Sequence, residues 1–73
     1  MKHKITFEIT FEDGWYTASA LDYGIVTQGH TFEELVENVQ EATSLYLEGE
    51  ESELTKENVE IFGVFEIPFI FNL

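Results

Sequence analysis

The sequence predicts an α+β fold in which an antiparallel sheet of three to four strands carries one helix on one face, in the order β-β-β-α-β. Apolar and polar residues alternate over the first twelve positions, which is typical of half-buried strands. From residue 31 the apolar residues recur every three to four positions, which indicates a helix with one packed face. A final strand-like run starts at Val59. At 73 residues, we expect a single domain over positions 1–73.

The first two strands are expected to form a hairpin. In residues 3–12, one face carries large apolar side chains, namely Ile5, Phe7, Ile9 and Phe11. Asp13-Gly14 is typical of a tight turn, and the β-rich run Trp15–Ala20 follows it. Small residues leave room for a helix across the sheet, so we assign one face of the second strand to the core: Tyr16, Ala18 and Ala20.

A corner at residues 21–24 leads to a short third strand over residues 25–28, which ends at Gly29. The helix is expected from Phe32 to about Glu48, with Gly49 as its stop. Thr31 is placed to cap its first turn, and Glu34 to reach back to the Thr31 N–H, as in a capping box. The expected packed stripe consists of Phe32, Leu35, Val36, Val39, Ala42 and Tyr46.

The final run, residues 59–73, is apolar on both faces of any strand it forms. Pro68 cannot donate to a strand ladder, so this run is expected at a sheet edge or outside the sheet. Such a surface would aggregate in water, and we therefore expect a second subunit to cover it. The alternative is a strand buried wholly within one chain. The expected interface residues are Phe65, Ile67, Phe69, Ile70 and Phe71.

The charge is strongly acidic. Fifteen Asp and Glu against three Lys and Arg give a net charge of −12, which opposes direct binding to nucleic acid or to an anionic membrane. We expect a basic partner, although the same charge also serves solubility alone. No signal peptide is recognisable, and no apolar run reaches the ~20 residues of a membrane span, so we expect a cytoplasmic protein.

Catalytic and metal-binding patterns are not recognisable. The chain has no Cys, its two histidines are far apart in sequence, and no metal-ligand spacing occurs, so we expect neither an enzyme nor a cofactor or metal. One alternative is a metal-dependent nuclease, because the element order resembles part of a ribonuclease H-like fold. Its carboxylate candidates are Glu8, Glu12, Asp13 and Asp22, but no three of them form an obvious cluster.

The segment from Asp22 to Leu47 resembles the HicB family of antitoxins. The matching residues are Gly24, Thr27, Gly29, Thr31, Glu33, Glu34, Asn38, Glu41, Ala42 and 45–47, preceded by the strand pair around 13–16. The resemblance covers residues 2 to about 48. It departs from the family at two places. Gly24 lacks the neighbouring Pro that is usual in the family. Many members also carry a DNA-binding segment after the acidic domain, for which this sequence leaves no room. We therefore expect no DNA binding.

The resemblance implies that the chain binds and neutralises a small basic RNA-cleaving toxin of the HicA type. The small core and the apolar final run separately lead us to expect a homodimer or homotetramer. The first candidates for partner contact are Glu33, Glu37 and Glu41, which recur every four residues on the face of the helix that is expected to be exposed to solvent. Trp15 and Tyr23 are candidate aromatic anchors. The alternative function is an orphan oligomeric scaffold or regulatory domain without a toxin partner.

Overall fold

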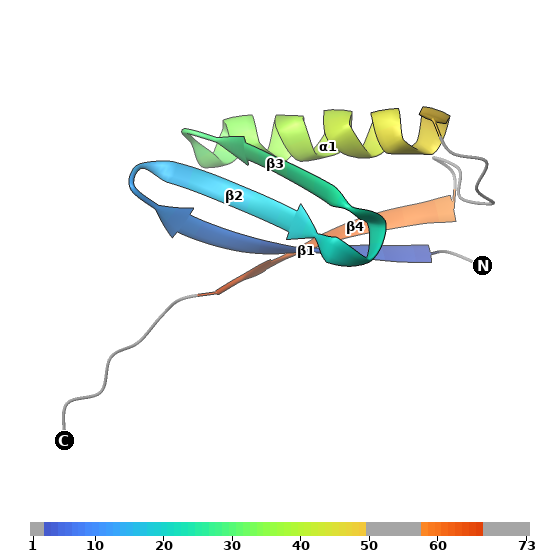
Figure 1. Cartoon of the computed structure of the whole chain (residues 1–73), viewed down its shortest axis with the longest axis horizontal. Coiled ribbons are helices and arrows are strands. Elements are labelled where there is room, and N and C mark those ends of the chain that lie inside the picture. Colours follow the sequence, from blue (N-terminus) through green and yellow to red (C-terminus); the bar gives the residue numbers. More distant parts are fainter. Residues whose placement is uncertain (1–2, 50–57, 67–73) are drawn as a thin grey trace, which may run out of the picture.

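The computed structural model describes residues 3–49 and 58–66, and it places one helix on one face of a four-stranded sheet (Figure 1). This arrangement confirms the α+β class. The elements, in chain order, are β1 (His3–Glu12), β2 (Trp15–Ala20), the 3-10 helix η1 (Leu21–Tyr23), β3 (Ile25–Gly29), α1 (Phe32–Gly49) and β4 (Val59–Phe65).

The strand order is β3-β2-β1-β4. β1 and β2 pair antiparallel, as do β2 and β3, but β4 runs parallel to β1. The sheet is therefore mixed, which differs from the wholly antiparallel sheet that we expected. The reason is the direction of α1. It starts at the end of β3 and runs antiparallel to β3 along the sheet, which returns the chain to the end of the sheet where β1 and β3 begin (Figure 1). β4 starts from that end and therefore runs parallel to β1.

The β1–β2 hairpin closes through a tight turn at Asp13 and Gly14. Both residues have left-handed backbone conformations, with φ of 51° and 82°. Two such residues make a turn whose twist matches that of the flanking strands. The Asp-Gly signature in the sequence thus sets the hairpin register, in which Glu12 lies opposite Trp15.

The core lies between α1 and one face of the sheet. Its buried residues are Ile5, Phe7, Ile9, Ala18, Ala20, Ile25, Leu35 and Val39. The buried Ala18 and Ala20 confirm the expected core face of β2. Phe11 shares the apolar face of β1 with Ile5, Phe7 and Ile9 but is 57% exposed, because it lies at the hairpin end of β1, where its ring contacts Tyr16 at a centroid distance of 4.6 Å.

The helix buries a narrower stripe than its sequence pattern predicts. Leu35, Val39 and Thr43 are buried, whereas Phe32 and Val36 remain 46% and 39% exposed. The cause is the position of α1, which packs mainly on β3 and β2 and leaves the β4 side of the helix open.

Gly29 allows α1 to start close to the end of β3. A Cβ atom at Gly29 would lie 2.7 Å from the backbone nitrogen of Leu35, which is closer than real Cβ contacts. The first turn of the helix therefore needs glycine at this position.

Candidate partner-binding surface

The start of α1 is held by reciprocal hydrogen bonds. The Glu34 N–H donates to Thr31 Oγ1 at 3.0 Å, and the His30 N–H donates to Glu34 Oε1 at 3.1 Å. The Thr31 half of the expected capping box is confirmed, but the other half is wrong, because the Glu34 carboxylate accepts from the His30 N–H and not from the Thr31 N–H. The first bond satisfies a backbone donor of the first helical turn, and the second joins the residue before the cap to that turn.

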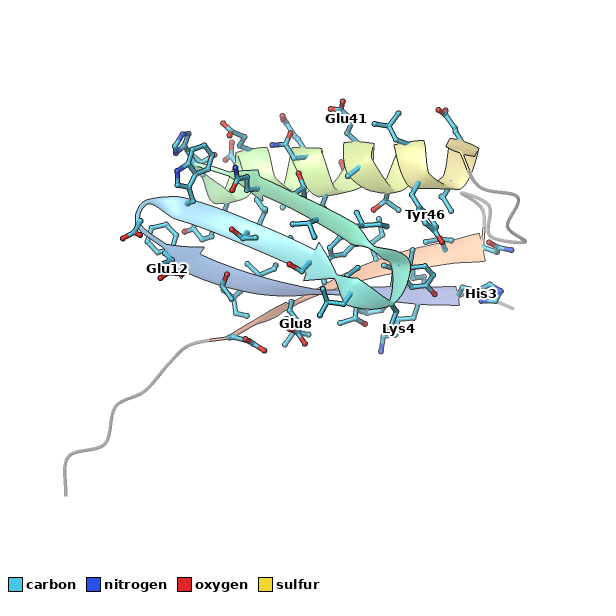
Figure 2. The ribbon with its side chains drawn as sticks, in the orientation of Figure 1. His3, Lys4, Glu8, Glu12, Glu41 and Tyr46 are labelled. Atoms are coloured by element: carbon cyan, nitrogen blue, oxygen red, sulfur yellow. The ribbon has the colours of Figure 1, made fainter. Side chains whose placement is uncertain are left out.

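The outer side of α1 carries Glu33, Glu37 and Glu41, which are all exposed; we call these three residues the acidic helix face. Figure 2 shows Glu41 directed away from the sheet and Tyr46 directed toward it. The helix contains no Lys, Arg or His, so no basic side chain within α1 neutralises these carboxylates. Like charges four residues apart destabilise a helix slightly, and a cationic partner would relieve this repulsion.

Trp15 lies beside His30 at the end of the molecule where α1 begins. The two rings have a centroid distance of 3.5 Å and an interplanar angle of 33°, and His30 Nδ1 lies 3.4 Å from the Gly14 carbonyl oxygen. The indole remains 37% exposed. Because His30 immediately precedes the helix cap, the Trp15–His30 pair adjoins the start of the acidic helix face.

Sequence reasoning missed the contact between Trp15 and His30. The signal that would have found it is the strand register. Tyr16 lies opposite Gly29, so the residue before Tyr16 and the residue after Gly29 meet at the same end of the β2–β3 pair.

Tyr23 lies in a different environment from Trp15. It is half-buried and contacts the Tyr46 ring edge-on, with centroids 5.7 Å apart. Trp15 begins β2 and Tyr23 follows its end, so the structure separates the two candidate anchors by the length of that strand. Tyr23 also borders a hollow of about 310 Å³, which includes Lys4 and Glu8.

Of the expected interface residues, Phe65 lies in β4 and is 48% exposed. Its ring stacks on Phe32 of α1, with centroids 5.6 Å apart. The others, Ile67, Phe69, Ile70 and Phe71, lie outside the described residues.

The carboxylates considered for a nuclease are spread over several elements. Glu8 and Glu12 are exposed on β1, Asp13 is in the hairpin turn, and Asp22 is in η1. Within residues 3–49 and 58–66, no group of three or more His, Cys, Asp or Glu side chains is placed to hold a metal ion. In the same part of the chain, no helix has the length and apolar character needed to cross a membrane.

A scan against protein-family models, a search of curated proteins and a search of solved structures each returned no match.

Proposed function

We propose that this chain is a HicB-like antitoxin domain that binds and neutralises a small basic RNA-cleaving toxin of the HicA type in the cytoplasm. The observation that carries the proposal is the acidic helix face, three exposed carboxylates on a helix without basic residues, in a chain of net charge −12. The resemblance of residues 22–47 to HicB antitoxins supports the choice of partner. The proposed role requires no catalysis, cofactor or metal.

The mechanism is competition for a cationic surface. An RNA-cleaving protein must hold RNA phosphates with basic side chains, and a row of carboxylates binds the same groups. Successive glutamates of the row are four residues apart, which corresponds to about 6 Å along the helix axis. Opposite fields also accelerate encounter, up to about 10⁸–10⁹ M⁻¹s⁻¹ at low salt.

Trp15 is the aromatic anchor that best fits this mechanism. Its indole is partly exposed and held in place by His30, and it adjoins the acidic helix face. Trp is enriched among residues that dominate binding energy. Tyr23 is a second anchor only for a partner that also reaches the far end of β2.

An orphan scaffold or regulatory domain is the second candidate. It is favoured by the exposed apolar surface of β4, where Ile61, Phe62, Val64 and Phe65 are 40–50% exposed. A chain with this role assembles as a homodimer or homotetramer and needs no toxin.

The test compares two variants with the same change of charge. One is Glu33→Gln/Glu37→Gln/Glu41→Gln on the acidic helix face. The control is Glu8→Gln/Glu12→Gln/Glu60→Gln, three exposed carboxylates on the sheet face that α1 does not cover. Wild type and both variants, each tagged, are used at low salt to capture proteins from the native host, and the captured protein is identified and assayed for RNA cleavage with and without the chain.

We expect wild type and the control variant to capture one small basic protein in a stoichiometric amount. Added salt is expected to release this protein, which then cleaves RNA. An exposed charge pair contributes about 0.2–1 kcal/mol, so removing three weakens binding by roughly threefold to 150-fold. Capture of no such protein, or equal loss of binding in both variants, contradicts the proposal. In the first case the orphan scaffold becomes the better assignment.

A further inference from the structure

β4 forms one edge of the sheet. Its neighbour on one side is β1, and no strand among residues 3–49 and 58–66 pairs with its other side. Six of its seven residues are exposed. Natural edge strands usually carry charges, proline or bulges that prevent pairing with another chain, but the centre of β4 is Ile61-Phe62-Gly63-Val64-Phe65, without a charge.

The backbone of β4 presents an open row of hydrogen-bonding groups. The Glu66 N–H donates to the Ile9 carbonyl oxygen of β1 at 2.9 Å. Because backbone groups alternate in direction along a strand, Phe62 and Val64 also direct their N–H and C=O groups toward β1. The corresponding groups of Ile61, Gly63 and Phe65 therefore point outward, away from the sheet.

The sequence around Gly63 matches its own reverse in apolar character. Suppose that two β4 strands meet antiparallel about a two-fold axis at Gly63. Ile61 then lies opposite Phe65 of the second copy, and Phe62 lies opposite Val64 of the second copy. Each is a pair of an aromatic and a β-branched residue, a combination that stabilises neighbouring antiparallel strands. In this register the outward-facing N–H and C=O groups of Ile61, Gly63 and Phe65 in one copy point toward those of the second copy.

We propose that β4 is a self-association surface, on which a second copy of this chain pairs its own β4 antiparallel about Gly63 to join the two sheets. The contact is isologous and closes as a two-fold dimer. It does not depend on toxin binding, because it uses the sheet edge rather than the acidic helix face. Phe32 and Val36, on the open side of α1 next to β4, extend the apolar surface.

The area and the charge both indicate a weak dimer. The exposed parts of six side chains amount to roughly 500 Å² per copy, so burying all of them would give at most roughly 1,000 Å² for the pair, the lower limit for a specific interface. They belong to Phe32, Val36, Ile61, Phe62, Val64 and Phe65. The same register places Glu60 opposite Glu66 of the second copy, and each chain has a net charge of −12. Added salt therefore strengthens the dimer.

The experiment measures the mass of the full chain by sedimentation equilibrium over a range of concentrations at moderate salt. Val64→Lys introduces a charge on β4, and Val26→Lys is its matched control. Both valines are exposed, at 50% and 61%, and lie on edge strands on the face that α1 does not cover, but Val26 is on the opposite edge. Both variants change the net charge equally.

Wild type and Val26→Lys are expected to approach twice the 8.4 kDa chain mass with concentration. Val64→Lys is expected to raise the dissociation constant by about tenfold or more. A wild type that stays monomeric at all concentrations, or equal dimerisation of the two variants, overturns the proposal.

Hydrogen exchange of the wild-type amides tests the pairing without any variant, including the case in which Val64→Lys does not fold. The amides of Ile61, Gly63 and Phe65 are expected to gain protection in concentrated samples. The amides of Phe62 and Val64, which face β1, are protected at every concentration. Protection of the first group that does not change with concentration overturns the proposal.

Discussion

Thr43 offers a direct test of how the helix packs on the sheet. Its side chain is 2% exposed, and among the described residues its Oγ1 atom has no hydrogen-bond partner. A buried hydroxyl without a partner costs about 1–3 kcal/mol. Thr43→Val replaces the hydroxyl with a methyl group of similar size, and Thr and Val have similar helix propensities. The hollow beside Thr43 is lined by the apolar Leu47, Val59 and Ile61, together with Gln40 and Ser44.

We expect Thr43→Val to raise the free energy of unfolding by about 1 kcal/mol, which corresponds to about 4–8 °C in Tm for a domain of this size. Urea denaturation measures the change as a higher midpoint with an unchanged m-value. The control is Thr10→Val, the same substitution at an exposed position of β1, which is expected to change stability by no more than about 0.5 kcal/mol.

A destabilised or unchanged Thr43→Val would refute the reasoning, since it would mean that the hydroxyl is hydrogen-bonded in solution. Thr43→Ser separates the two contributions of the side chain. It keeps the hydroxyl and removes the buried methyl group, so it is expected to be less stable than wild type.

Two further predictions concern the C-terminal end of β3. Gly29→Ala is expected to destabilise the fold by about 1–3 kcal/mol in urea denaturation, because the new methyl group meets the backbone of α1. Gly49→Ala is the control, since its methyl group meets nothing within 4 Å. Equal effects of the two substitutions would contradict the close approach of Gly29 to α1. His30→Ala is expected to shift the emission of the single Trp, Trp15, to longer wavelength because the imidazole ring that covers the indole is lost. His3→Ala is its control, and unchanged emission in His30→Ala would rule out this ring contact in solution.

Local features of the fold were predictable from sequence. Alternation in residues 3–12 predicted β1, the Asp13-Gly14 pair predicted the hairpin turn, and Thr31 with Glu34 predicted the start of the helix. The helical period also placed Glu33, Glu37 and Glu41 on one exposed face. These features depend on residues a few positions apart, whose spacing follows from the geometry of a single strand, turn or helix.

Features of the candidate surfaces that join distant parts of the chain depended on the tertiary structure. The ring contact between Trp15 and His30 follows from the β2–β3 register. A sequence pattern marks the face on which each side chain lies, but it does not specify which distant side chain will meet it.

The sequence by itself determined the elements of this protein, its helix cap and its acidic helix face, because each arises from contacts within a few residues. The tertiary structure decided the parallel pairing of β4 with β1 and the exposure of Phe32 and Val36. Both follow from where α1 lies on the sheet. That position results from the packing of many side chains at once, which the period of one segment does not encode.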